Sequence, residues 1–500
     1  MTGIFRGTRF RSLAAVTLAL SATSASAETL REALAKAYQY NPTLNATRAG
    51  LRATDEQVPL TRAEGLPAVN LSGQFSDILH QDNRQLFTGS TISVPTQPDR
   101  NVSGTVQLSV PVYAGGSIRN SVAAAKLRVE AGQNNLRATE SSLFANVVAA
   151  YMDVIRDSQV VYLNRQNVLA LETNLRASSD RFEVGDLTRT DVAQSDSRLA
   201  LARANLQTAE ATLIGSKERY IALVGTPLSD PQTPDALPGL PESPELAVQI
   251  ALVDNSDLLA AIKNRDAARY DLKSLRGRSM PRINGFVSGS YLDYLGTEKD
   301  LNAVALTTTP RTNKSATAGV QLSVPLYQGG RQSALSRQGV ARESQAIEQL
   351  TETERSVISQ VRSSYASWRA ALETIASTRT AVKAAALSLE GVKAENSAGT
   401  RTILDILNAE QEALNARVQL VSAERNAYVA GFSLIAAMGH AEARDLNLDA
   451  GPLYDPNVNY RRAKNTFFDF DYGRDPQPVS TSTRDTPPQT STVVEIRKTQ

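Results

Sequence analysis

The polar residues of this 500-residue chain form no pattern typical of catalysis. Its two histidines, His80 and His440, are isolated, and neither has a partner spacing that indicates a metal site or a nucleophile. The chain contains no cysteine, so thiolate chemistry and disulfide bonds are excluded. The Gly-Gly pairs at 115–116 and 329–330 are not followed by Gly-Lys-Ser/Thr and are not phosphate loops. We therefore expect no enzyme, no cofactor and no metal site.

Two charged residues have a spacing that places them together. Arg401 and Asp405 stand four residues apart, which makes them neighbours on one face of a helix. Taken alone, such a pair is an exposed surface ion pair of small energetic value. Asp191 has a similar ambiguity, because a carboxylate in the first turn of a helix simply opposes the helix dipole. The function of these residues therefore depends on the elements that carry them.

The first residues of the chain indicate export. Three arginines precede the apolar run 13–22 and the small-residue motif at 25–27, which is the order of a secretory signal peptide. The apolar run is too short to span a bilayer. We therefore expect residues 1–27 to be removed and Glu28 to be the first mature residue.

The composition excludes several classes of protein. The 53 basic and 51 acidic residues nearly cancel, so the chain lacks the basic footprint that nucleic-acid binding requires. No apolar run after residue 27 is long enough for a transmembrane helix. Aromatic residues make up only 5% of the chain, which favours long coiled helices over several compact domains.

An internal repeat organises the sequence. The segment from Val106 to Gly116 recurs from Val320 to Gly330, an offset of 214 residues. The same offset relates Asn41 to Asn255, Pro67 to Pro281, Tyr151 to Tyr365, Asp191 to Asp405, and Gly225 to Gly439. Because no gap is needed over about two hundred residues, we infer two copies of one unit.

The repeat gives the expected domain organisation. The predicted segments are a signal peptide (1–27), repeat 1 (28–226), a Pro-rich linker (227–243), repeat 2 (244–440), and an equatorial segment with a disordered tail (441–500). The tail, from about residue 455, lacks hydrophobic periodicity, so we expect it to be disordered or loosely wrapped around the helices.

Each copy contains a predicted β-hairpin, over 68–112 and 282–326. Apolar and polar residues alternate along 68–78 and 102–110, and the second copy repeats the pattern. The strands have about ten residues, the length that a tilted membrane strand needs. A soluble antiparallel sheet with one solvated face would show the same alternation.

Two features favour a membrane barrel over a soluble sheet. Pro111 and Pro325 are expected to end their strands, and long loops at 79–100 and 294–313 join the paired strands. Long loops at one end and short turns at the other are typical of outer-membrane barrels.

The remainder of each copy is expected to be helical. Proline-free segments at 117–182 and 330–396 carry apolar residues every seven positions, which predicts coiled packing of long helices. A helix of 66 residues would reach roughly 100 Å. Further helices are predicted over 188–226 and 402–440. A shorter helix should run from Pro42 to Glu64, with a kink at Pro59.

These features together resemble the TolC-like outer-membrane efflux proteins. The duplicated unit, the Leu-Ser-Val-Pro-x-Tyr-x-Gly-Gly junctions and two hairpin tips, at 181–191 and 398–407, carry the resemblance, which spans about residues 28–440. It implies an α+β membrane protein that is a homotrimer. Four strands from each protomer would close a twelve-stranded outer-membrane barrel, continuous with a long periplasmic α-helical barrel. Membrane strands tolerate no open edge, so some oligomer is required in any case.

The resemblance also implies a function without chemical transformation. The protein would be an exit duct in the outer membrane, in contact with its lipid, with a helical tunnel in the periplasm. It would dock with a periplasmic adaptor and an inner-membrane transporter, either an ABC transporter or a proton-driven pump. The cargo would be small molecules, as in drug efflux, or proteins, as in type I secretion. The sequence does not separate these two, and a soluble periplasmic coiled-coil scaffold remains the alternative.

By resemblance, the gate and the docking surface lie at the hairpin tips. The implied gate or constriction residues are Thr190, Asp191, Arg401, Asp405 and Asn408. The implied adaptor-docking residues are Val184, Gly185, Leu187, Ala398, Gly399 and Thr400. Asn408 stands where the family has a second acidic ring, and Asn396 where a tyrosine often completes the latch. We therefore expect less negative charge at the entrance and a weaker latch.

Overall fold

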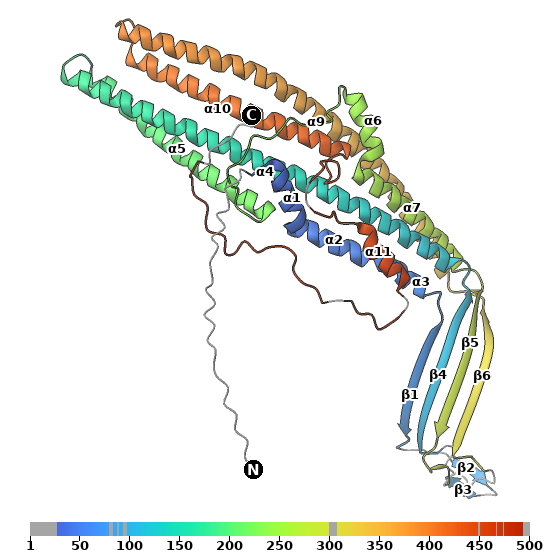
Figure 1. The fold of residues 1–500 in the computed structure, drawn as a ribbon. Coiled ribbons are helices and arrows are strands. Elements are labelled where there is room, and N and C mark those ends of the chain that lie inside the picture. Colours follow the sequence, from blue (N-terminus) through green and yellow to red (C-terminus); the bar gives the residue numbers. More distant parts are fainter. Residues whose placement is uncertain are drawn as a thin grey trace, which may run out of the picture.

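The chain forms an elongated body of helices with a β-sheet at one end, as the computed structural model shows (Figure 1). The structure describes residues 28–79, 84–87, 90–93, 98–299, 308–448, 451–466, 468–473 and 475–493. The expected signal peptide and His80 lie outside the described residues. None of the described helices is both long enough and apolar enough to cross a membrane.

Short helices precede the sheet and follow the linker, and four long helices form two hairpins. The helices are α1 Leu30–Tyr40, α2 Pro42–Asp55, α3 Gln57–Ala63, α4 Ser117–Glu183, α5 Arg189–Val224, α6 Pro244–Asp254, α7 Ser256–Gly277, α9 Arg331–Ser397, α10 Ile403–Met438 and α11 Pro456–Asn465. The strands are β1 Ala68–Asp77, β2 Arg84–Phe87, β3 Ser90–Ser93, β4 Arg100–Tyr113, β5 Arg282–Asp293 and β6 Thr312–Ser323.

The long helices pair as two antiparallel hairpins. Helices α4 and α9 have 67 residues each, and α5 and α10 have 36 residues each. At 1.5 Å per residue, α4 and α9 each reach roughly 100 Å. Helix α4 pairs with α5, and α9 with α10, so that both hairpin tips lie at the end of the molecule farthest from the sheet (Figure 1).

The expected helix from Pro42 to Glu64 is irregular ahead of Pro59, where we predicted a kink, and one residue in helical conformation, Glu56, separates α2 from α3. Asn41 caps α2 as predicted, because its side chain accepts hydrogen bonds from Thr43 N and Leu44 N. The helix ends at Asp55, and α3 begins at Gln57. Proline has no N–H and its ring clashes with the carbonyl four residues earlier, so the irregularity falls four residues before Pro59. The second copy has a lysine at the equivalent position, and there α7 runs unbroken for 22 residues.

The sheet is antiparallel, with the order β1-β4-β5-β6. Its register keeps apolar positions on one face, since Leu71 pairs with Val106, Val106 with Gly289, and Gly289 with Ala316. The adjacent row is polar and consists of Ser72, Thr105, Ser290 and Ser315. Among the described residues, strands β1 and β6 each pair with one neighbour only, so both edges of the described sheet are open.

Two expectations about the strands need correction. Strand β4 does not end at Pro111 but continues to Tyr113, with a shift of register between these two residues. A proline lacks the N–H that a ladder needs, and an irregularity at that position accommodates it. The expected loop 79–100 contains a small second hairpin, in which Arg84 pairs with Ser93.

The two copies are buried very unequally. Helix α4 places Phe144, Val147, Tyr151, Val154 and many other side chains in the main core. Helix α9 has the same length, yet its buried residues are only Gly339, Val357, Val361, Ser364 and Ala385. Several of its apolar side chains are exposed, among them Val340, Ile347 and Leu387. Helix α9 packs against α10 and α7, but the side of α9 that carries these exposed apolar residues is not covered by any described part of the chain.

The tail contains a helix that we did not expect, and parts of its remainder contact the long helices. Residues 456–465 form α11, and beyond it hydrogen bonds tie single positions of the tail to the helices. The side chain of Lys217 donates to the carbonyls of Thr490 and Thr492 at 2.9 and 2.8 Å, and Asn45 donates to Ser480. Hydrogen bonds thus attach the tail to the helices, although its sequence has no hydrophobic periodicity.

Candidate functional site at the hairpin tips

The first tip joins α4 to α5 through a tight turn. Gly185 has φ +83°, a conformation that residues with a side chain rarely adopt. Arg181 forms an ion pair with Asp186 across the turn at 2.7 Å. Thr188 then caps α5: its hydroxyl accepts from the N–H of Asp191, whose carboxylate accepts from the N–H of Thr188 at 3.0 Å. This reciprocal arrangement is a capping box.

The second tip, between α9 and α10, is built in the same way. Gly399 has φ +80°. Thr402 and Asp405 form the same capping box, with the carboxylate accepting from the N–H of Thr402 at 3.0 Å. The guanidinium of Arg401 pairs with Glu395 at 2.8 Å across the turn. Both tips are therefore held by one local ion pair and one capping box.

The caps also set the protonation of the tip carboxylates. Hydrogen bonds from Thr188 lower the pKa of Asp191. Hydrogen bonds from Thr402, with a smaller contribution from the charge of Arg401, lower the pKa of Asp405. The hydrogen bond and charge of Glu395 raise the pKa of Arg401. All three groups are therefore ionised at neutral pH, and the two carboxylates are already engaged with helix N-termini.

The residues implied to contact an adaptor lie at the ends of the hairpins. Val184 is 80% exposed although its side chain is apolar. Leu187 is half-buried, and the exposed residues of this set are Val184, Gly185, Ala398, Gly399 and Thr400. The tips thus present accessible backbone and small or apolar side chains.

The implied gate residues are not brought together within one chain. Thr190 and Asp191 belong to the first tip, and Arg401 and Asp405 to the second. Across the part of the chain that the structure describes, no hydrogen bond or ion pair joins Arg401 to Thr190 or Asp191. The side chain of Asn396, at the position of the latch tyrosine, donates instead to the carbonyl of Arg401 at 2.7 Å. It stabilises the turn of its own hairpin.

Asn408 is the implied gate residue that does join the two hairpins. Its side-chain oxygen accepts from Arg198 of α5 at 2.8 Å. Two residues further along α10, the buried carboxylate of Glu410 accepts from Asn174 of α4 at 2.8 Å and pairs with Lys393 of α9 at 2.9 Å. We call Asn174, Arg198, Lys393, Asn408 and Glu410 the hairpin bridge.

The sequence reasoning missed most of this arrangement. The sequence indicated only that Asn408 replaces an acidic residue. It did not indicate the hydrogen bond between Asn408 and Arg198. The capping boxes were readable, because Thr188 and Asp191 have the Thr-x-x-Asp spacing, as do Thr402 and Asp405. No local signal pointed to Arg198 or Glu410, because each has its partner on the other hairpin, Asn408 or Asn174, more than two hundred residues away in the sequence.

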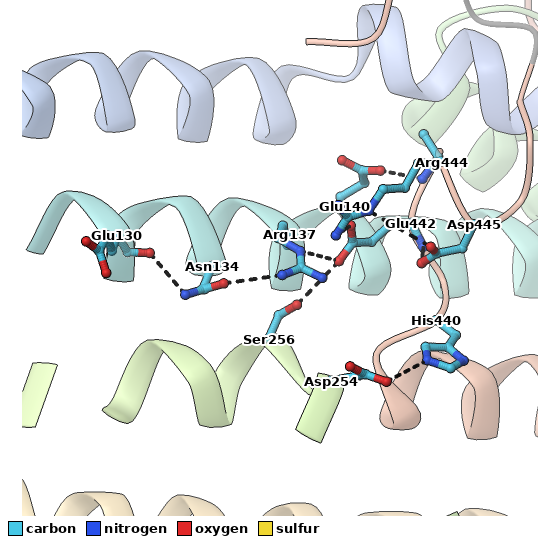
Figure 2. Close-up of polar contacts among 11 residues, drawn as sticks. Glu130, Asn134, Arg137, Glu140, Asp254, Ser256, His440, Glu442, Arg444 and Asp445 are labelled. Atoms are coloured by element: carbon cyan, nitrogen blue, oxygen red, sulfur yellow. Dashed lines mark hydrogen bonds and ion pairs between the residues drawn. The ribbon is translucent and has the colours of Figure 1, made fainter. Parts of the chain in front are cut away.

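A second group of charged residues lies nearer to the sheet, where the chain leaving α10 crosses α4 (Figure 2). Glu442 accepts from Arg137 at 2.5 Å and pairs with Arg444 at 2.9 Å. Glu140 accepts from the backbone N–H of Ala443 at 2.5 Å. We call Arg137, Glu140, Glu442 and Arg444 the equatorial cluster.

Glu442, which joins the two arginines of the equatorial cluster, is withdrawn from water, whereas Arg137 is partly exposed and Arg444 is exposed. Glu442 is only 4% exposed, and burial, reinforced by the charge of Glu442, raises the pKa of Glu140 to about 7. His440, which sequence reasoning treated as isolated, lies 3.0 Å from the carboxylate of Asp254 (Figure 2). Among the described residues, no group of three or more His, Asp or Glu side chains is arranged to hold a metal ion.

Comparison with known proteins identifies relatives among outer-membrane efflux and secretion proteins. The family model described as "Outer membrane efflux protein" matches residues 33–226 and 247–440. The chain is 34% identical to the outer membrane efflux protein BepC of Brucella suis, over 90% of this chain and 93% of the relative. It is 28% identical to the alkaline protease secretion protein AprF of Pseudomonas aeruginosa, over 72% of this chain and 74% of the relative. The crystal structure of the outer membrane protein VceC of Vibrio cholerae shares the fold, with a TM-score of 0.69 at 20% identity, over 82% and 96% of the two chains.

Proposed function

Because this chain belongs to the outer membrane efflux protein family, we propose that it is one protomer of a trimeric, gated exit duct. Members of the family are outer-membrane channels with a helical part in the periplasm, and they are not enzymes. This membership excludes the soluble scaffold that the sequence left open. The proposal concerns the assembly, the gate and the partners.

The open edges of the sheet carry the proposal. Strands β1 and β6 each have one neighbour, and an unpaired strand edge cannot remain in a bilayer, because no water is there to satisfy its N–H and C=O groups. Three copies of this four-stranded sheet would close a barrel of about twelve strands, a size within the known range for outer-membrane barrels. The apolar row from Leu71 to Ala316 would face lipid, and the polar row from Ser72 to Ser315 the lumen.

The unequal burial of the long helices supports the same trimer. In a closed ring, the exposed face of α9 would pack against a helix of the adjacent protomer. Side chains such as Val340, Ile347 and Leu387 would then be withdrawn from water. The long helices would line a tunnel of roughly 100 Å that begins at the barrel.

The hairpin tips form the gate in this proposal. Thr190, Asp191, Arg401, Asp405 and Asn408 lie in the last turns of the tunnel. The link between Arg198 and Asn408 keeps the two hairpins of one protomer together, and Arg401 stiffens the turn that would face the neighbouring protomer. Opening would require the hairpins to separate. Three copies of Asp405 would give the entrance a negative charge that attracts cations.

The partners would be a periplasmic adaptor at the tips and, behind it, an inner-membrane transporter, either an ABC transporter or a proton-driven pump. The adaptor would contact Val184, Gly185, Leu187, Ala398, Gly399 and Thr400. The cargo would be small molecules or proteins; BepC is named as an efflux protein, and AprF as a protein for the secretion of alkaline protease. Identity is higher and coverage larger for BepC, which favours small-molecule efflux.

Single-channel conductance in planar bilayers tests the proposal. We would compare the wild type with Arg401→Ala and with a matched control, Arg379→Ala, which removes an exposed ion pair to Glu424 on the same hairpin but away from the tip. We expect small openings from the wild type and the control, and larger or more frequent openings from Arg401→Ala. Silence from all three proteins after confirmed reconstitution would contradict the duct. Equal conductance of all three would keep the duct and remove Arg401 from the gate.

A further inference from the structure

Three exposed aromatic side chains follow α11. Phe468, Phe470 and Tyr472 are 80%, 84% and 86% exposed, and they lie within five residues. Single exposed apolar residues are common on protein surfaces, but a cluster of large rings marks an interaction site. We call residues 468–472 the aromatic segment.

Hydrogen bonds fix where the aromatic segment begins. Asn459 of α11 donates to Asp55 at 2.8 Å, and Arg62 of α3 donates to the carbonyl of Lys464 at 3.3 Å. Helix α3 ends at Ala63, and β1 begins at Ala68. The chain therefore leaves α11 beside the point where the helices give way to the sheet. Figure 1 shows it turning there, past the end of α3.

The reach of the chain keeps the aromatic segment near that level. Phe468 is four positions after Lys464, so even a fully extended chain carries Phe468 no more than about 14 Å from the anchored carbonyl. The tail then returns along the helices, because Asn45, near the start of α2, donates to Ser480. Residues 45 and 62 are about 25 Å apart along the helices. The aromatic segment is thus the part of the tail close to the sheet.

Other rings and apolar side chains lie at the same end of the sheet. Tyr113 ends β4, and Leu326 and Tyr327 follow β6; all three side chains are exposed. Tyr113 and Tyr327 are related by the internal repeat. Aromatic residues form girdles at both membrane interfaces of outer-membrane barrels, where an amphipathic ring is best accommodated.

We propose that the aromatic segment is an interfacial anchor that inserts among the phospholipid headgroups of the periplasmic leaflet, beside the barrel. It extends the girdle of Tyr113 and Tyr327 onto a segment outside the barrel. The proposal rests on the proposed barrel being in the membrane.

The charges next to the segment fit a phospholipid surface. Arg461, Arg462 and Lys464 lie on α11, four to seven positions before Phe468. Arg461 and Arg462 pair with Asp455 and Glu56, and Lys464 can approach lipid phosphates. Of the two acidic residues between the rings, Asp471 already accepts from the N–H of Gly473 at 3.2 Å. The anchor would hold the helical body at a fixed height relative to the bilayer.

Depth measurements on single-cysteine variants test the anchor, since the natural chain has no cysteine. A fluorescent label at Phe470→Cys would be read in lipid nanodiscs of phosphatidylethanolamine and phosphatidylglycerol, which leave both faces of the bilayer accessible. Iodide would quench a label in water, and doxyl-labelled phospholipid would quench a label in contact with lipid. Leu71→Cys on β1 reports the barrel surface, and Val479→Cys, an exposed position farther along the tail, reports water.

The expected result is doxyl quenching at Phe470→Cys several-fold stronger than at Val479→Cys, together with protection from iodide. Iodide quenching equal to that of Val479→Cys would overturn the anchor. Protection from both quenchers would also overturn it, because a neighbouring protomer would then cover the segment. If the label at Leu71→Cys also failed to contact lipid, the barrel itself would be wrong. If only the label at Leu71→Cys contacted lipid, the proposed barrel would stand and the proposed anchor would be wrong.

Discussion

The hairpin tips and the equatorial cluster both depend on charged side chains but hold them in opposite environments. Arg401 and Glu395 are each about half exposed, at 51% and 52%, so water screens their attraction and the pair contributes little to stability. Glu442 is buried between two arginines, and an ion pair of that kind is costly to break. The tip contacts can therefore exchange at small cost, whereas the equatorial contacts cannot. We infer that the tips are the moving part and the equatorial cluster is the fixed part.

The largest stability effect is expected at Glu442. Glu442→Gln would leave Arg137 and Arg444 without their shared carboxylate, which we expect to lower the free energy of unfolding by about 3 kcal/mol. The value lies at the low end for buried pairs because both arginines are partly exposed. Denaturant unfolding of the helical signal in detergent measures it. The control is Glu412→Gln at an exposed position on α10, and equal stability of the two variants would contradict the account.

A pH-dependent effect of intermediate size is expected at Glu140. Burial raises the pKa of Glu140 from an ordinary 4.5 to about 7. Its stabilising contribution is therefore complete below pH 4.5 and is lost as the pH rises through 7. Glu140→Gln keeps an oxygen for the N–H of Ala443 and should be more stable than the wild type by about 2 kcal/mol at pH 8. Unfolding at pH 4 and pH 8 measures this. A difference that does not change with pH would show that the burial of Glu140 is unimportant.

A smaller and local effect is expected at the helix cap of the second tip. Thr402→Ala removes the hydroxyl of the capping box, which should cost about 1 kcal/mol. Because only the start of α10 depends on this cap, the change should appear as faster amide exchange near residue 405, with the equatorial cluster unaffected. Thr402→Ser should restore protection. Faster exchange throughout the protein would mean that the tips and the cluster unfold together.

The smallest stability effect is expected at the contact between Arg198 and Asn408 in the hairpin bridge. Asn408 is exposed and Arg198 partly so, and a single hydrogen bond to a charged group in water is worth about 0.5 kcal/mol or less. Arg198→Ala should therefore leave global unfolding almost unchanged while increasing the frequency of channel openings. A loss of stability as large as that of Glu442→Gln would remove the distinction between the moving and fixed parts.

Local sequence signals predicted much of the fold. The offset of 214 residues placed equivalent helices and strands in both copies, and α4 and α9 follow it residue for residue. Asn41 predicted the cap of α2, and Pro59 predicted the irregularity between α2 and α3. Pro111 was expected to end β4, but the sheet accommodates a missing N–H through a shift of register.

Contacts between distant segments could not be predicted. Arg198 and Asn408 are 210 residues apart in the sequence, and Arg137 and Glu442 are 305 apart. Neither pair has a local pattern, since each depends on how two helices pass one another. The order of the tail depends in the same way on Lys217, which holds two distant carbonyls. The helix caps at the tips could therefore be predicted from the sequence, whereas the contacts that join the two hairpins could not.

Reversible cross-linking during conductance recording tests most directly whether the tips are the moving part. In the cysteine-free chain, Arg198→Cys/Asn408→Cys places one thiol on each hairpin at the bridge, and a short bis-methanethiosulfonate reagent would join them until a reductant removes it. The control is Ser121→Cys/Ser274→Cys, a pair between α4 and α7 near the sheet whose hydroxyl oxygens are 2.7 Å apart. We predict that cross-linking abolishes large openings at the bridge, that the reductant restores them, and that the control pair conducts equally in both states. Large openings that persist with the bridge cross-linked would contradict gating by separation of the hairpins.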